Sequence, residues 1–378
     1  MRSLVVALII HLTLNPLIFL KGWYLFKRRR VLQRCWTVIF ISELLLYVVG
    51  FLFRHHLPHE IIHPISIMGT SWMLFLLYLG GLVLIGDLVY LLLSRNIARP
   101  RELLNQPQKI KVGLFLASIV VVVLALSYGS YRFHHPVVKQ LSMEIGKRSG
   151  RMDSVKIAVV GDLHLGYLID RNDARRMVEL IMAQQPDLIL FVGDILDSRI
   201  EPVEQQRMDE ELRRLDAPLG IYSCTGNHEY RYEGERKIGW LNDAGITMLR
   251  DSAVLVDSSF YVVGREDLVI PDRQSLVGLL DRQEVDRSLP LIVLNHTPNN
   301  LDEEVDAGAD IALYGHTHQG QAFPGNLATR MAFEVAYGYL KKGNTHIYVT
   351  SGLGLAGPQF RIGTVSEVVV LHVKFRAE

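Results

Sequence analysis

The sequence has few cysteines and almost no excess charge, and both shortages narrow its class. Only Cys35 and Cys224 occur among 378 residues, which excludes a disulfide framework and a zinc site built from cysteine. Lys plus Arg number 40 and Asp plus Glu number 39, so the net charge is +1. This balance excludes a basic nucleic-acid-binding surface as the main design, and we expect no nucleic-acid partner.

Apolar residues, in contrast, are abundant and unevenly placed. They make up 49% of the chain, and the mean hydropathy of +0.20 is high for a soluble enzyme but low for a transporter. These totals indicate two unlike parts. We expect a transmembrane region over residues 1–131, a connector over 132–153 and a catalytic domain over 154–378.

Four long apolar runs occupy the first part, at residues 4–20, 35–53, 67–93 and 112–128. A helix needs about 20 apolar residues to cross a ~30 Å hydrocarbon core, so the runs predict about four helices in a lipid bilayer. The connections after the first and third runs collect Lys and Arg, which is typical of cytoplasmic loops. Both termini and the catalytic domain are then predicted to be extracytoplasmic, and one misjudged span would reverse this orientation.

His59-Glu60-Ile61-Ile62-His63 matches the H-E-x-x-H pattern in which two histidines on one helix share a zinc ion. Pro58 and Pro64 bracket these residues, so we expect at most one helical turn. A short loop between two spans has no surrounding domain to form a substrate cleft. The sequence therefore favours a polar surface loop over a metalloprotease site.

The second part alternates short β-rich runs with helical patterns, which predicts an α/β fold. The predicted strands are 155–160, 188–192, 220–224, 260–263, 291–294, 311–313, 346–350 and 368–373. Helices are expected at 172–185, with Asn172 as its cap, and at 203–215 and 233–244. Residues 320–343 are weakly patterned and predict a long functional loop.

Five polar motifs directly follow predicted strands. They are Gly161-Asp162-Leu163-His164, Gly193-Asp194-Ile195-Leu196-Asp197, Gly226-Asn227-His228-Glu229, Asn295-His296-Thr297-Pro298 and Gly315-His316-Thr317-His318. Ligands of open α/β sheets bind outside the carboxyl ends of strands, so these motifs are expected to converge.

The residue types in these motifs are those of a metal centre. Carboxylates, an amide oxygen and imidazoles without sulfur suit Mn²⁺, Fe or Zn²⁺. The candidate ligands are Asp162, His164, Asp194, Asn227, His296, His316 and His318. Seven ligands are too many for one ion and suit two divalent metal ions that share a carboxylate.

A pair of cations suits displacement at phosphorus, because it binds phosphoryl oxygens and makes hydroxide available from water near neutral pH. His228, beside Asn227, can then serve as the general acid that protonates the leaving oxygen. The alternatives for His228 are a further metal ligand or an orienting hydrogen bond.

The five motifs, in this order, resemble the calcineurin-like metallophosphoesterase family over residues 155–373. The resemblance implies a two-sheet β-sandwich flanked by helices. It implies one metal on Asp162, His164, Asp194 and His318, and a second on Asp194, Asn227, His296 and His316, with Asp194 bridging. It also gives His228 the catalytic role, and it makes Asp197 a residue that supports the ligands.

The run from Gly315 to Gln321 is similar to a membrane-associated subgroup of bacterial phosphodiesterases, in which a glycine commonly stands at the place of Gln319. Members of that subgroup tend to carry an arginine near the last strand, so Arg361 is a candidate phosphate contact. The alternative is an ordinary surface arginine. The segment 362–367 departs from the proline-rich form of the subgroup, so no substrate contacts carry over there.

The leading hypothesis is a multi-pass, membrane-anchored enzyme of the cell membrane. It would hydrolyse phosphodiester or pyrophosphate bonds of a lipid-linked or cell-envelope substrate. Some relatives cleave a UDP-linked lipid precursor, which is the alternative if the domain is cytoplasmic. A non-catalytic metal-binding sensor and a transporter with an accessory domain are weaker hypotheses. The sequence leaves the metal identity, the natural substrate and the oligomeric state open.

Overall fold

The computed structural model describes residues 9–53, 56–96, 107–271 and 273–376. The chain divides into two compact units, and each is described by itself. The first comprises residues 1–130 with 357–359, and the second comprises residues 131–356 with 360–378.

The first unit is helical. Its elements are the π-helix η1 (Ile10–Leu14) and the α-helices α2 (Asn15–Phe26), α3 (Arg30–Leu52), α4 (His59–Asn96) and α6 (Pro107–His134). Among the described residues, three helices are long and apolar enough to cross a membrane, at Arg30–Gly50, His59–Val89 and Gln108–His134. They match the second, third and fourth predicted runs and indicate membrane association. The first predicted run falls partly outside the described residues, and its described part is helical.

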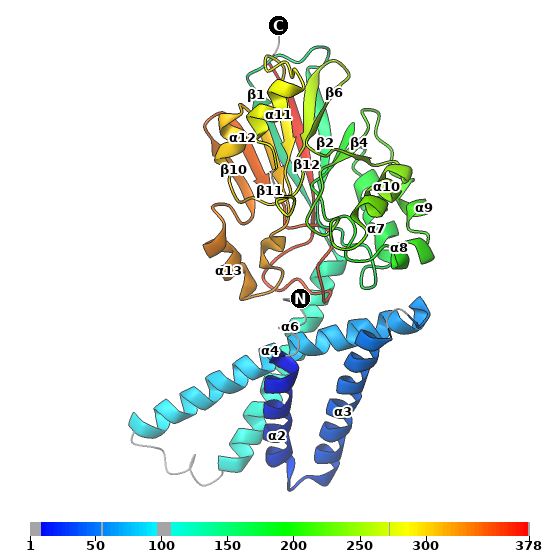
Figure 1. The fold of residues 1–378 in the computed structure, drawn as a ribbon. Coiled ribbons are helices and arrows are strands. Elements are labelled where there is room, and N and C mark those ends of the chain that lie inside the picture. Colours follow the sequence, from blue (N-terminus) through cyan, green and yellow to red (C-terminus); the bar gives the residue numbers. More distant parts are fainter. Residues whose placement is uncertain (1–8, 54–55, 97–106, 272, 377–378) are drawn as a thin grey trace. The chain divides into compact units, whose positions relative to one another are not determined.

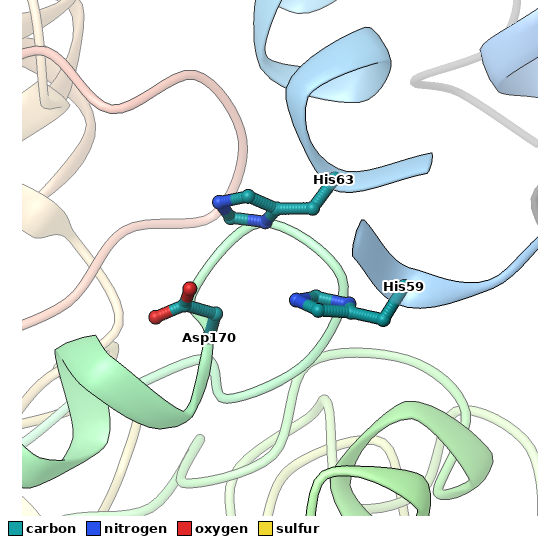
Figure 2. A group of neighbouring side chains, drawn as sticks. All are labelled: His59, His63 and Asp170. Carbon is teal, nitrogen blue, oxygen red and sulfur yellow. The ribbon is translucent and has the colours of Figure 1, made fainter. Parts of the chain in front are cut away.

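The expectation of a loop at His59–His63 is wrong. These residues form the first turns of α4, and the helix continues through Pro64. Proline lacks one N–H donor, and so near a helix start it removes only one intrahelical bond. Figure 2 shows His59 and His63 projecting from successive turns, with ring centroids 4.9 Å apart.

Two mixed β-sheets form the second unit (Figure 1). The first sheet has the order β1 (Val137–Ile145), β12 (Glu367–Phe375), β2 (Ser154–Val160), β3 (Leu188–Phe191), β4 (Ile221–Ser223) and β5 (Thr247–Met248). From β2 to β5 the strands are parallel, whereas β12 runs antiparallel to β2 and parallel to β1.

The second sheet has the order β10 (Gly338–Lys342), β11 (Thr345–Val349), β9 (Ile311–Tyr314), β8 (Leu291–Leu294), β7 (Phe260–Gly264) and β6 (Ser252–Val256). Its four central strands are parallel, and both edge strands pair antiparallel. Side chains from both sheets share one buried core that includes Ile157, Leu190, Ile292 and Leu371. The predicted two-sheet sandwich is therefore confirmed.

Helices cover the outer faces of this sandwich. Buried residues of α7 (Arg171–Met182) and α10 (Gly234–Asp243) pack with the outer side chains of β3. On the second sheet, α11 (Leu276–Arg282) contributes Leu276, Leu279 and Leu280 to a smaller core with β7 and β8. The remaining helices are α8 (Glu201–Gln205), α9 (Asp209–Leu212), α12 (Asp302–Asp306), η2 (His318–Gly320) and α13 (Gly325–Ala332).

The local predictions differ from the structure in several places, and β5, β6, α11 and α12 were not predicted. Asp170, not Asn172, caps α7, and it forms a capping box with Asp173. The helix expected at 203–215 is two short helices, α8 and α9. The expected connector contains strand β1, which pairs with β12 over its whole length. The expected loop at 320–343 holds α13 and β10.

Candidate metal centre

All seven predicted ligands lie in loops that leave the carboxyl ends of parallel strands. Their elements are β2 for Asp162 and His164, β3 for Asp194, β4 for Asn227, β8 for His296, and β9 for His316 and His318. Parallel strands deliver their carboxyl ends to one edge of a sheet, and here the edges of both sheets meet. The structure brings every predicted ligand into one cluster.

Asp162, His164 and His318 form the first group within this cluster. The Nε2 atoms of His164 and His318 are 3.0 Å apart, and His318 Nε2 lies 3.5 Å from Asp162 Oδ1. Asp162 Oδ1 is also 3.9 Å from His164 Nε2. All three side chains are buried, so the facing nitrogen and oxygen atoms converge on one point away from bulk water.

Asp194, His296 and His316 form the second group. His296 Nε2 lies 3.2 Å from Asp194 Oδ2 and 3.3 Å from His316 Nδ1. The amide oxygen of Asn227 is 2.9 Å from His316 Nδ1. At its other ring nitrogen, His296 Nδ1 donates to the carbonyl of Val192 at 2.7 Å, which leaves Nε2 directed at the cluster.

One carboxylate oxygen lies between the two groups. Asp194 Oδ2 is 3.7 Å from His164 Nε2 on one side and 3.2 Å from His296 Nε2 on the other. Facing imidazole nitrogens and carboxylate oxygens at these separations repel through their lone pairs unless protons or cations lie between them. The donor set therefore fits divalent cations of the Mn, Fe or Zn type.

The electrostatics of the cluster divide its histidines. Burial alone would lower the pKa of His296, but the Asp194 carboxylate outweighs it and raises this pKa to about 10, so a cation bound at Nε2 would displace a proton. Burial, together with the neighbouring His296, lowers the pKa of His316 to about 4. Burial also lowers the pKa of His318. Neutral imidazoles at His316 and His318 can serve as metal ligands at neutral pH.

The backbone of the cluster is held in the left-handed region. Five of the candidate ligands have φ between 49° and 69°, namely Asp162, His164, Asp194, His316 and His318. Aspartate and histidine tolerate this region better than most residues, yet each instance costs free energy that the surrounding contacts must offset.

Glu229 holds two of these turns, a role that the sequence analysis did not assign. Its buried carboxylate accepts the N–H groups of Asp194 and Gly226 at 2.8 and 2.7 Å. It also accepts those of Ile195 and Leu196 at 2.8 and 3.1 Å. Glu229 therefore ties the turn that carries Asp194 to the turn that carries Asn227. Its place beside His228 in the Gly-Asn-His-Glu motif was the available signal.

His228 lies at the rim of the first group. Its ring centroid is 4.5 Å from that of His164, and its backbone N–H donates to Asp194 Oδ1 at 2.7 Å. Nδ1 of His228 lies 2.9 Å from Asp197 Oδ1. Burial would raise the pKa of Asp197, but the neighbouring His164 and His228 rings outweigh it and hold this pKa below its usual range. Asp197 thus stays ionised and orients the ring of His228.

Arg361 is fully buried, so the alternative of a surface arginine is wrong. Its Nη2 donates to the carbonyls of Ser351, Gly352 and Gly354, at 2.7, 3.0 and 2.8 Å. Nη1 donates to the carbonyl of His318 at 2.8 Å. These contacts hold the loop after β11 against the His318 turn, and they favour an organising role over direct contact with a phosphate.

Comparison with known proteins agrees with this geometry. The family model described as calcineurin-like phosphoesterase matches residues 155–320, which contain all seven candidate ligands. A Bacillus subtilis protein named Uncharacterized metallophosphoesterase YkuE is 31% identical over 258 residues, covering 65% of this chain and 90% of that protein. The chain belongs to the calcineurin-like metallophosphoesterase family. It is accordingly a metal-dependent phosphoric ester hydrolase.

Two further relatives extend the likeness of this metallophosphoesterase. A Danio rerio protein named Transmembrane protein with metallophosphoesterase domain is 28% identical over 407 residues, which cover 99% of this chain and 91% of that protein. A Helicobacter pylori protein named Uncharacterized metallophosphoesterase is 29% identical over 268 residues, covering 70% of each chain. The first of these alignments includes the helical unit as well as the phosphoesterase unit.

Proposed function

We propose that this metallophosphoesterase is anchored in a membrane and uses two divalent cations to hydrolyse phosphodiester or pyrophosphate bonds of a lipid-linked or cell-envelope substrate. The observation that carries the proposal is the position of Asp194 Oδ2 between two groups of imidazoles and carboxylates. A carboxylate shared in this way is the usual bridge of a two-cation phosphoesterase site.

The described residues divide between the two positions. Asp162, His164, His318 and Asp194 would hold one cation, and Asp194, Asn227, His296 and His316 would hold the other. Cations bound there would offset the charge of the phosphoryl group and lower the pKa of a water molecule. Glu229 keeps the Asp194 and Asn227 turns in register, so both positions depend on it.

His228 is the proposed general acid. Hydrolysis leaves an alkoxide or phosphate oxygen that needs a proton, and His228 is the imidazole at the rim that Asp197 orients through Nδ1. The Asp197 carboxylate, 2.9 Å from Nδ1, sets the direction of the ring. The proton would pass from Nε2 of His228 to the departing oxygen.

The surroundings of the second group support a substrate with a hydrocarbon part. Phe333 packs its ring edge-to-face on His316, with centroids 6.2 Å apart. It follows α13, an amphipathic helix that buries none of its side chains. Leu327 is 47% exposed and Met331 is 89% exposed, one turn apart on that helix. Exposed apolar side chains on the helix that precedes Phe333 favour an ester that carries an acyl or polyprenyl chain.

The basic connection between α2 and α3 supports the proposed orientation. It contains Lys27, Arg28 and Arg29, and Arg30 follows as the first residue of α3. Such a loop is retained in the cytoplasm, and four crossings would then put the phosphoesterase unit on the extracytoplasmic side.

The test compares the wild-type chain with Asp194→Asn in detergent, using a soluble bis-aryl phosphodiester. Asp194→Asn removes the shared charge, so turnover should fall by a factor of about 10³ or more while the far-ultraviolet circular dichroism stays unchanged. Asp243→Asn on the exposed face of α10 is the matched control and should retain full turnover. Equal turnover by Asp194→Asn and the wild type would refute the two-cation assignment.

A further inference from the structure

We infer that Lys237 is a positioning residue for His228 and sets the geometry of proton transfer to the leaving oxygen. Lys237 lies on α10, away from the motifs that carry the ligands. The inference rests on the proposed role of His228.

The ammonium group of Lys237 uses its donors on backbone carbonyls of two functional loops. Nζ donates to the carbonyl of His228 itself, to that of Arg231 at 2.8 Å and to that of Ser198 at 3.0 Å. A lysine ammonium has three N–H donors, so these three acceptors satisfy it completely. The side chain is fully buried, and water does not compete for these bonds.

These bonds tie together the two chain segments that form the His228–Asp197 contact. Asp197 lies next to Ser198 in the loop after β3, and His228 lies in the turn after β4. Nδ1 of His228 is 2.9 Å from Asp197 Oδ1, so the ring direction depends on the distance between these loops. Lys237 fixes that distance by bonding to both loops at once.

Apolar packing alone does not require a lysine here. Burial lowers the pKa of Lys237, while Glu229 and Asp197 oppose that effect, so an ammonium group at this position has a desolvation cost. Apolar residues of similar volume often stabilise such positions equally well or better. Ile238 and Leu241 already supply the apolar packing of α10. What the lysine adds is directed donors to the His228 and Ser198 carbonyls.

The preceding residue on α10 offers a matched control. Arg236 is half exposed, and its guanidinium bonds to Glu204 and Glu233 at 2.6 and 2.9 Å. Neither partner is a candidate ligand or contacts His228 in the described part of the chain. Arg236→Met therefore removes a cation and its hydrogen bonds from the same helix without changing the contacts of Lys237 with the His228 and Ser198 carbonyls.

The experiment measures kcat, KM and bound metal for the full chain with esters of good and poor leaving groups, 4-nitrophenyl and phenyl. In Lys237→Met, the loss of kcat should be at least about tenfold greater for the phenyl ester than for the 4-nitrophenyl ester, because only the poor leaving group needs the proton. KM and metal content should stay near wild type. Arg236→Met should match the wild type throughout, and Lys237→Arg should recover part of the loss.

A double variant separates positioning from general stability. His228→Ala should show the same steep dependence on the leaving group, and adding Lys237→Met to it should cost no more than about twofold. Equal loss on both esters, loss of metal, or full additivity with His228→Ala would overturn the inference. If Lys237→Met does not fold, Lys237→Arg provides the test. A kcat in Lys237→Arg that depends on the leaving group as it does in the wild type would also overturn the inference. Absence of turnover by the wild type on either ester would instead refute the proposed function.

Discussion

Asp194 makes more contacts than a metal ligand requires. Oδ2 faces His164 and His296, one from each group, whereas Oδ1 accepts the backbone N–H of His228 at 2.7 Å. The same side chain therefore sets the separation of the two proposed cation positions and the place of the proposed acid. A substitution of Asp194 should therefore disturb both proposed cation positions and the position of His228.

Glu229 should control metal affinity without being a ligand. In Glu229→Gln, the amide NH₂ would face backbone N–H groups that now donate to the carboxylate. At least one of these N–H groups would then lack an acceptor. We expect the affinity for divalent metal to fall about 10–100-fold while the chain stays folded. Metal titration followed by mass spectrometry measures this. Glu235→Gln, at a largely exposed position of α10, should bind metal as the wild type does, and an unchanged affinity in Glu229→Gln would contradict the account.

The sequence indicates candidate site residues where the chemistry needs a particular side chain, and their metal binding stays a prediction. Asp162, Asn227 and His316 offer metal-ligand atoms directly after predicted strands, so pattern and chemistry agree on them. The roles of Arg361 and Lys237 could not be predicted, because their partners are backbone carbonyls of loops distant in sequence. No side-chain pattern records such partners.

Among the elements, most strands that the sequence predicts are buried on both faces, although β4 was also predicted and is only partly buried. β8 and β9 are continuous apolar runs, fully buried along their length. Strand β1 was missed because Lys139, Gln140 and Ser142 interrupt its apolar pattern at an edge of the sheet, where one side of the strand is solvated. The α13 helix was missed because its sequence has no side-chain cap and buries nothing.

The exposed face of α13 should matter only for substrates with a hydrocarbon part. In Leu327→Gln/Met331→Gln, we expect KM for a long-chain phosphate ester to rise about tenfold or more, because two apolar side chains no longer shield the chain from water. Turnover of the soluble bis-aryl phosphodiester should not change. Parallel kinetics on the two substrates measure the difference. Val277→Gln on α11 is a matched exposed control, and an unaltered KM for the long-chain ester in the α13 variant would count against a lipid-linked substrate.

The contact between α7 and α9 should depend on pH through Glu211. Hydrogen bonds from Arg175, Arg171 and Arg214 lower the pKa of Glu211 to about 2 from its ordinary 4.5. A depressed carboxyl pKa stabilises the fold above the ordinary value, and this stability is lost as pH falls toward 2. Glu211→Gln should therefore lower the free energy of unfolding at pH 7. We expect a loss of only about 1–2 kcal/mol, because the arginines are partly exposed and solvent screens their charges.

Trp240 on α10 can report this unfolding once Trp23, Trp36 and Trp72 are replaced by phenylalanine. In that background, we compare the urea midpoints of unfolding of two metal-free chains, one with Glu211 and one with Glu211→Gln. The difference between them should be largest at neutral pH. The two midpoints should converge between about pH 4.5 and pH 2. A difference that grows on acidification would reverse the sign of this account.

At the scale of the whole molecule, the topology of the helical unit determines on which side of the membrane hydrolysis takes place. If the chain crosses the membrane four times, with the basic connection after α2 in the cytoplasm, a tag after residue 378 should react with impermeant reagents in intact cells. A cysteine introduced at position 28 should stay protected until the cells are permeabilised. Protection of the tag would reverse the orientation and favour a substrate on the cytoplasmic side.

The central claim, that strand ends of two sheets gather two cations around Asp194, is tested most directly by the metal content of the active protein. Plasma mass spectrometry of the purified full chain, alongside turnover of the bis-aryl phosphodiester, should give about two divalent ions per chain in fully active preparations. Asp194→Asn should hold one or none and be inactive. Full turnover with no bound metal, or with a single ion per chain, would contradict the account.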